Sequence, residues 1–193
     1  MPLLSERIEL LREDLIADPP RISAYHDLPF AIFLYYPTEE FEYRQKLRLL
    51  AISLEQNHHR RVTCISLAGM MWEAIRETEG VAAIVEEERE LGFDRAQRTL
   101  STLLSDPDFA PLPVALEERM RELDPATDVV FLVRAGVFAP AIYHMSKLLD
   151  EMKGRTAVPT VLFYPGGLEG NTGLIFMDMT DREAIGNYRV KIY

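Results

Sequence analysis

The sequence predicts an α/β domain of three layers, in which helices cover both faces of a mostly parallel sheet of about five strands. The strongest evidence lies in residues 128–167, whose pattern is strand, glycine turn, helix, strand, glycine turn. The two apolar runs, residues 129–133 and 158–164, are nearly continuous and do not alternate in polarity. Such runs are typical of strands that are covered on both faces. A helix from Pro140 to about Met152 would join them into a βαβ unit.

The N-terminal third predicts a second unit of this kind. Ser5 is a candidate N-cap for a first helix, whose apolar stripe consists of Leu4, Ile8, Leu11 and Leu15. Residues 30–35 are expected to form a buried strand. Thr38 can then cap a helix that reaches about residue 57, and residues 62–67 form the next strand. Residues 30–67 therefore predict another βαβ unit.

The remaining segments complete the fold. Residues 68–124 have helical patterns throughout, which predicts a helical insertion between the second and third strands. No flexible linker sets this insertion apart, so we expect a single α/β domain over residues 1–193. The glycine-rich residues 166–173 lead into another apolar run, which predicts a C-terminal antiparallel hairpin. Residues 188–193 alternate in polarity and predict an edge strand.

Composition narrows the class of protein. The chain has 193 residues, a formal net charge of −10 and one cysteine, Cys64, which we expect to be a small buried hydrophobe in its strand. It shows neither a signal peptide nor a membrane-spanning apolar run, so we expect a cytoplasmic protein that does not contact membranes. The acidic charge argues against general nucleic-acid binding. The basic residues 58–61 favour a solvated turn, and DNA binding through Arg60 and Arg61 is the weaker alternative.

Two glycine segments are candidates for phosphate binding. Residues 166–173 lack a lysine at the required spacing and lead into a strand instead of a helix, so a phosphate loop is disfavoured there. Residues 136–140 leave a buried strand and enter the predicted helix, which is where open α/β sheets usually bind ligands. Phe138 would crowd a phosphate, however, so helix capping with apolar packing is the favoured interpretation of this loop.

Arg134 is the residue of greatest interest. It ends an apolar strand at the presumed ligand edge, where a guanidinium must find oxygen partners, and Tyr164 occupies the matching place on the neighbouring strand. An ion pair from Arg134 to Glu39 or Glu40 that ties the sheet edge is favoured over a binding role. The candidate partner- or ligand-binding residues are Arg134, Gly136, Phe138, Tyr164, Gly166 and Gly167.

The sequence offers no set of side chains for catalysis or metal binding. The four histidines, residues 26, 58, 59 and 144, lie outside any metal-ligand spacing, and Cys64 cannot be matched with a histidine. We therefore expect no catalytic residues, no metal and no cofactor.

The residues of the C-terminal βαβ unit resemble a known family. Residues 129–140, residues 147–150 and the run 158–166, which ends in Phe163-Tyr164-Pro165-Gly166, are similar to the BrxB proteins of bacteriophage exclusion (BREX) systems. The closing residues 187–192 resemble that family's C-terminal tyrosine–arginine strand. The resemblance covers most of the chain.

The resemblance implies a non-enzymatic adaptor or scaffold in a defence system that methylates host DNA and restricts phage. Its partners would be other BREX proteins, with the phosphatase-like PglZ first and the BrxC ATPase or the PglX methyltransferase as alternatives. An α/β nucleotide- or phosphate-binding enzyme that uses Arg134 and the loop 136–140 is the alternative function.

Overall fold

The computed structural model describes residues 3–23, 28–169, 173–177, 179 and 190–193. Within these residues a parallel sheet has the strand order β2-β3-β4-β1-β6, and β5 pairs with β4 in the antiparallel direction. The strands are β1 (Phe30–Tyr35), β2 (Arg61–Ser66), β3 (Asp128–Val133), β4 (Thr160–Glu169), β5 (Gly173–Phe176) and β6 (Lys191–Ile192). The predicted α/β class and its C-terminal antiparallel addition are confirmed.

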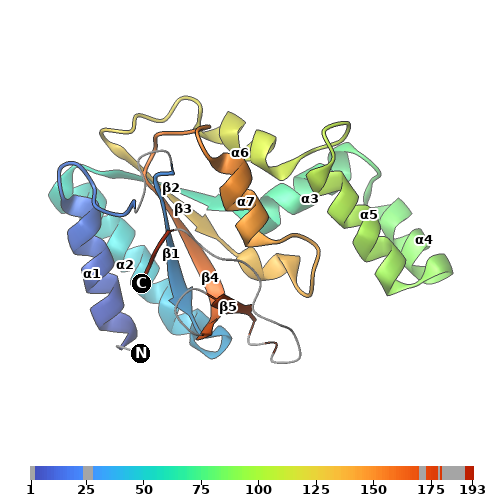
Figure 1. Ribbon diagram of the computed structural model, residues 1–193, viewed down its shortest axis with the longest axis horizontal. Helices are drawn as coiled ribbons and strands as arrows, with labels where there is room; N and C mark the ends of the chain where they lie inside the picture. The colour runs from blue at the N-terminus through green and yellow to red at the C-terminus, as the bar shows by residue number, and fades with distance from the viewer. Residues whose placement is uncertain (1–2, 24–27, 170–172, 178, 180–189) are drawn as a thin grey trace.

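Helices lie on both sides of the sheet, which gives three layers (Figure 1). The helices α1 (Leu4–Ile16) and α2 (Glu40–His58) cover one face. The helices α3 (Leu67–Glu77), α6 (Leu112–Met120) and α7 (Met145–Met152) cover the other. The helices α4 (Val81–Leu91) and α5 (Phe93–Ser105) form an arm that extends away from the sheet (Figure 1). None of the helices in the described residues is long and apolar enough to cross a membrane.

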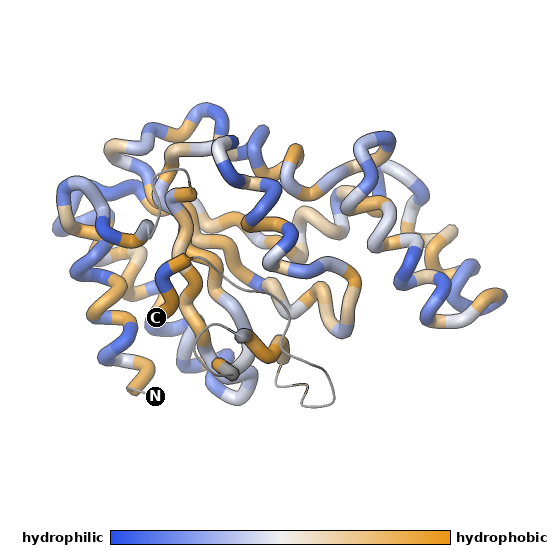
Figure 2. Tube along the Cα trace, viewed as in Figure 1, coloured by the Kyte–Doolittle hydropathy of each residue, from blue (hydrophilic) through white to orange (hydrophobic). Residues whose placement is uncertain are grey.

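Alternate residues of the central strands supply the two cores. In β1, Phe30, Ile32 and Leu34 face the α3–α6–α7 side, whereas Ala31, Phe33 and Tyr35 face α1 and α2. The central strands are accordingly the most hydrophobic part of the trace in Figure 2. On the α1–α2 side, the Phe163 ring lies between Phe33, Tyr43 and Phe131, at centroid distances of 5.5, 5.4 and 5.1 Å. Burying each such ring contributes about 1.5–3 kcal/mol, so both faces stabilise the fold.

The order of the strands is only partly what the sequence predicts. β3, α7 and β4 form the expected βαβ unit, with Val130 opposite Thr160 and Leu132 opposite Leu162. β1 and β2 are also parallel, but β4 and β3 lie between them. β1 instead pairs with β4 along its whole length. Residues 30–67 therefore do not form a unit of adjacent strands.

The four helices α3 to α6 lie between β2 and β3, as the predicted insertion requires. The single-domain organisation of residues 1–193 stays a prediction.

The two predicted N-caps, Ser5 and Thr38, are wrong. The capping residues are Leu3 and Tyr36, and in each case the glutamate three residues after the cap accepts a hydrogen bond from its backbone N–H. The backbone N–H of Leu3 donates to the Glu6 carboxylate at 3.1 Å, and the N–H of Tyr36 donates to Glu39 at 3.0 Å. Ser5 lies inside α1, where its hydroxyl accepts a hydrogen bond from Lys46. Thr38 lies in a short 3₁₀ turn, Pro37–Glu39, because proline favours the first turn of a helix.

The C-terminal strand is an edge strand, as predicted, and it is anchored to α1. Tyr193 N–H donates to the carbonyl of Ile32 at 2.9 Å, and its hydroxyl donates to Asp14 Oδ2 at 2.6 Å. Lys191 forms an ion pair with the same carboxylate. Residues 188 and 189 of the predicted strand lie outside the described residues.

Candidate functional site

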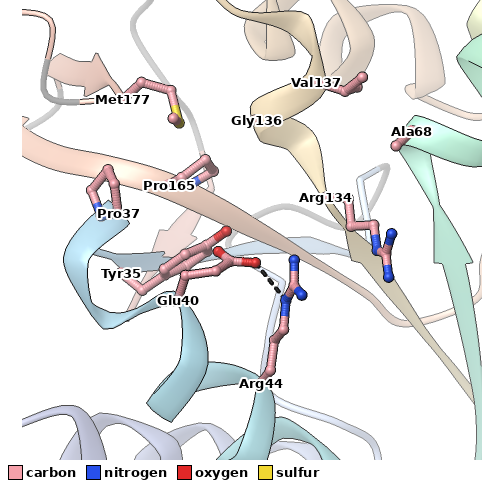
Figure 3. A pocket seen from close by; sticks show the side chains of 10 residues that line it. All are labelled: Tyr35, Pro37, Glu40, Arg44, Ala68, Arg134, Gly136, Val137, Pro165 and Met177. Atoms are coloured by element: carbon pink, nitrogen blue, oxygen red, sulfur yellow. Dashed lines mark hydrogen bonds and ion pairs between the residues drawn. The ribbon is translucent and has the colours of Figure 1, made fainter.

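A pocket of about 290 Å³ opens at the carboxyl ends of β1 and β3. Tyr35 ends β1, Arg134 follows β3, and Glu40 and Arg44 reach the pocket from the first turns of α2 (Figure 3). The carboxyl ends of parallel strands are where α/β proteins usually hold their ligands. The pocket is therefore the candidate functional site. The residues that line it are Tyr35, Pro37, Glu40, Arg44, Ala68, Arg134, Gly136, Val137, Pro165 and Met177.

The polar groups on the α2 side of the pocket are bonded to each other. Arg44 Nε donates to Glu40 Oε1 at 2.6 Å. Burial, together with a hydrogen bond to the Glu40 carboxylate, raises the pKa of Tyr35 well above its ordinary value, so its hydroxyl stays protonated. The Tyr35 ring stacks on Tyr43 at 4.0 Å. Glu40 thus already accepts bonds from two neighbours and is a poor candidate for a general base.

Unlike Arg44, Arg134 has no ion-pair partner among the residues that the structure describes. Its side chain is exposed, and among the described residues no carboxylate lies within ion-pair distance of it. Glu39 is instead 3.8 Å from the buried Arg7, and Glu40 pairs with Arg44, so the favoured ion pair of Arg134 to one of these glutamates is wrong. The backbone of Arg134 is also unusual, with φ 63° and ψ 37° in the left-handed region. A residue that has a Cβ adopts this region at a cost.

The loop 136–140 does not open a helix. A 3₁₀ turn, Ala135–Phe138, follows Arg134, and α7 begins only at Met145, so the predicted helix start at Pro140 is wrong. The cause is tertiary packing, because Phe138 is fully buried and its ring lies 5.8 Å from that of Tyr143. Phe138 belongs to the core and does not face the pocket. The nucleotide-binding alternative therefore loses the helix N-terminus that it placed at this loop.

Gly136 does line the pocket, and its lack of a side chain lets neighbouring groups approach. A Cβ at this position would lie 3.3 Å from Met177 Sδ and 3.7 Å from Pro165 Cγ.

The other predicted residues on β4 serve the β4–β5 hairpin. Tyr164 is buried, and its ring packs against Phe176 at 5.3 Å. Gly166 has φ 153°, and a Cβ there would lie 2.0 Å from the backbone oxygen of Ile175. Gly167 pairs with Ile175 in the same ladder. The predicted hairpin is confirmed, and residues 170–172 of its loop lie outside the described residues. Of the six predicted site residues, only Arg134 and Gly136 meet in the pocket.

Cys64 is exposed, so the prediction of a buried residue is wrong. β2 is an edge strand of the sheet, and of its residues only Ile65 is buried. Partial burial by the neighbouring groups, with a smaller effect from Glu55, raises the pKa of the Cys64 thiol. The thiol is therefore less reactive than an ordinary surface cysteine. Cys64 lines a second pocket, of about 360 Å³, which shares Glu40, Arg44 and Arg134 with the first.

Arg60, which precedes β2, and Arg61, its first residue, have structural roles. The guanidinium of Arg60 is largely buried and donates to the carbonyls of Ala17, at 3.0 Å, and Ala126. Arg61 forms a two-point hydrogen-bonded pair with the buried Asp128, at 2.6 and 2.8 Å. The solvated turn expected here is thus wrong for Arg60, and neither guanidinium is available as a simple phosphate contact.

Three or more metal-binding side chains do not gather anywhere in the described part of the chain. His26, one of the four histidines of the sequence, lies outside that part.

The residues that sequence reasoning missed are Arg44 and the neighbouring Arg48, which lines the second pocket. Their spacing of four residues, which places both on one side of a helix, was the available signal.

Comparison with known proteins gives one match. No curated protein and no solved structure matches the chain significantly. A family model described as "BREX protein BrxB" matches residues 63–192, which extend from β2 to β6 and include Arg134 and Gly136. The match covers about two thirds of the 193 residues. The chain therefore belongs to the BrxB family and is a component of a BREX phage-defence system.

Proposed function

We propose that this protein is a non-enzymatic adaptor of its BREX system and that it binds PglZ. Membership of the BrxB family is the observation that carries the proposal. The BrxC ATPase and the PglX methyltransferase are the alternative partners. By holding the components of the system together, the adaptor would support methylation of host DNA and restriction of phage.

Two features of the structure support an adaptor. Glu40 in the candidate site is bonded to both Arg44 and Tyr35, so the pocket has the properties of a recognition site more than those of a reaction centre. The arm formed by α4 and α5 presents exposed apolar side chains, with Leu91 63% and Phe93 54% exposed. Protein interfaces bury aromatic and aliphatic side chains of this kind.

Co-purification tests the proposal. The tagged full-length chain would be co-expressed in turn with PglZ, BrxC and PglX of its own operon and purified through the tag. We expect PglZ to co-elute in a stoichiometric amount. Co-elution of BrxC or PglX alone would show an adaptor with a different partner. If none of the three co-eluted, the adaptor function would be wrong.

A further inference from the structure

We propose that the two pockets at the carboxyl edge form one recognition groove, which binds an extended acidic segment of a partner protein. This inference rests on the proposed adaptor function and gives it a binding surface. We call the surface the arginine groove and define it by Arg44, Arg48 and Arg134, with Glu40 between them. The two pockets share Glu40, Arg44 and Arg134, so they are continuous across these side chains.

The charge of the arginine groove is opposite to that of the whole chain. Its charged residues are three arginines and one glutamate, which give a formal charge of +2, whereas the chain carries −10. Glu40 neutralises Arg44. Arg48 and Arg134 are both exposed, and neither has an ion-pair partner among the described residues. Two guanidinium groups are therefore available to an external anion, and guanidinium matches a carboxylate through two parallel hydrogen bonds.

The backbone of Arg134 is the second observation that points to a ligand. With φ 63° it occupies the left-handed region, where glycine is favoured over any residue with a Cβ. Within the described part of the chain, its side chain makes no ion pair that would explain its presence at this position. Strained residues of this kind cluster at ligand-binding sites. Fold stability alone would favour glycine here, so the guanidinium has another use.

The distribution of the cations favours an extended chain over a single small anion. The second pocket is lined by both unpaired cations, and the first is lined by Arg134 beside apolar side chains. A ligand that meets both cations and the apolar side chains must therefore extend across the two pockets.

The apolar end of the arginine groove extends the match. At one end Val137, Pro165 and Met177 form an apolar wall that suits an apolar residue of the partner. Ala68, in the first turn of α3, also lines the groove. The expected ligand is an extended segment with two carboxylates beside an apolar side chain.

The test measures the affinity of purified full-length protein for whichever of PglZ, BrxC and PglX co-elutes with it. The double variant Arg48→Glu/Arg134→Glu reverses both unpaired cations. We expect it to weaken binding about tenfold or more and to reduce the salt dependence of the affinity. The matched control is Arg76→Glu/Arg121→Glu, which makes the same charge change at exposed positions on α3 and at the end of α6. It should retain most of the affinity.

The variant Arg134→Gly separates recognition from folding. It removes the side chain and relieves the left-handed backbone, so we expect weaker binding with an equal or higher melting temperature. If the wild-type chain bound its partner and both groove variants bound it with the same affinity, the arginine groove would be overturned and the adaptor function would stay intact. Failure of the wild-type chain to bind any of the three proteins would overturn both.

A small ligand is the competing occupant. Thermal unfolding with ATP, AMP or inorganic phosphate would show it as a rise in melting temperature that Arg134→Gly abolishes. That result would overturn the acidic-segment proposal. A flat response, together with weakened partner binding in the groove variants, supports it.

Discussion

The carboxylate of Asp14 connects the first helix to the last strand, and Asp14→Asn tests how much that connection stabilises the fold. Asp14 lies in α1 and accepts a hydrogen bond from the Tyr193 hydroxyl at 2.6 Å. It also pairs with Lys191, and Arg21 Nε lies 3.4 Å from its other oxygen. Asparagine keeps the shape of the side chain and removes its charge.

The expected loss follows from these three contacts. Hydrogen bonds to charged groups contribute about 1.5–3 kcal/mol, and asparagine retains a neutral acceptor for Tyr193, so about 1 kcal/mol is lost there. Lys191 and Arg21 are partly exposed, with 40% and 66% of their side chains accessible. Each such pair contributes only about 0.5 kcal/mol. The free energy of unfolding should fall by about 2 kcal/mol, which lowers the melting temperature by about 4–8 °C in a chain of this size.

Urea denaturation of the wild type, Asp14→Asn, Tyr193→Phe and the double variant measures this loss. The double-mutant cycle should give a coupling energy of about 1 kcal/mol between the two side chains. Glu13→Gln, an exposed neighbour in the same helix, is the control and should change stability by less than about 0.5 kcal/mol. A coupling energy near zero would refute the reasoning that this hydrogen bond holds the C-terminal strand.

The pH dependence has a definite sign. Burial alone would raise the pKa of Asp14, but hydrogen bonds from Lys191 and Tyr193 lower it below its ordinary 3.8. A carboxyl with a depressed pKa in the folded state contributes stability above that ordinary value and loses the contribution as the pH falls below it. The difference in stability between wild type and Asp14→Asn should therefore be full at neutral pH and shrink in acid. A difference that grew toward low pH would contradict this assignment.

Three further substitutions test other parts of the structure. Gly166→Ala places a Cβ against the Ile175 oxygen and should destabilise the β4–β5 hairpin by about 2 kcal/mol or more, which faster amide exchange in β5 would show. Its control is Gly69→Ala, where a Cβ has ordinary contacts 3.5 Å away and should be tolerated. Asp128→Ala removes the partner of Arg61 and the acceptor of the Asp124 N–H at 2.7 Å, so the free energy of unfolding should fall by about 2–3 kcal/mol. A loss under about 0.5 kcal/mol would show that the Arg61–Asp128 pair does not stabilise the fold. Arg134→Gly should be more stable than Arg134→Ala by about 1 kcal/mol in urea denaturation, and equal stabilities would show that the left-handed backbone carries no strain.

The strands and helices could be predicted from the sequence because burial leaves a periodic pattern. The continuous apolar runs 129–133 and 158–164 have residues that pack alternately into the two cores, and this two-sided burial requires helices on both faces. Local pattern does not determine the order of strands. β1 pairs with β4, 130 residues later in the chain at Phe30 and Thr160, because both are apolar on both faces. β2 is left at the edge, which is why Cys64 is exposed.

The candidate site was predictable only where it coincides with the end of a strand. Arg134 was found because it follows an apolar run directly. Arg44 and Arg48 look in the sequence like ordinary solvated positions of a helix, and only the tertiary fold places them beside Arg134. The start of α7 was misplaced at Pro140, because a 3₁₀ turn that contains the fully buried Phe138 precedes it and the helix begins only at Met145.

The two ends of the parallel sheet differ in how their cations are used. At the amino ends, Arg61 pairs with the buried Asp128, and Arg60 donates to two backbone carbonyls, so these guanidinium groups are satisfied within the chain. At the carboxyl ends, Arg48 and Arg134 have no ion-pair partner in the described part of the chain, although the chain as a whole is acidic. A cation that the fold needs is costly to remove because its buried partner is left unpaired. Replacing Arg61 should therefore destabilise the protein, whereas replacing Arg48 or Arg134 should leave the fold intact and affect only what binds at that edge.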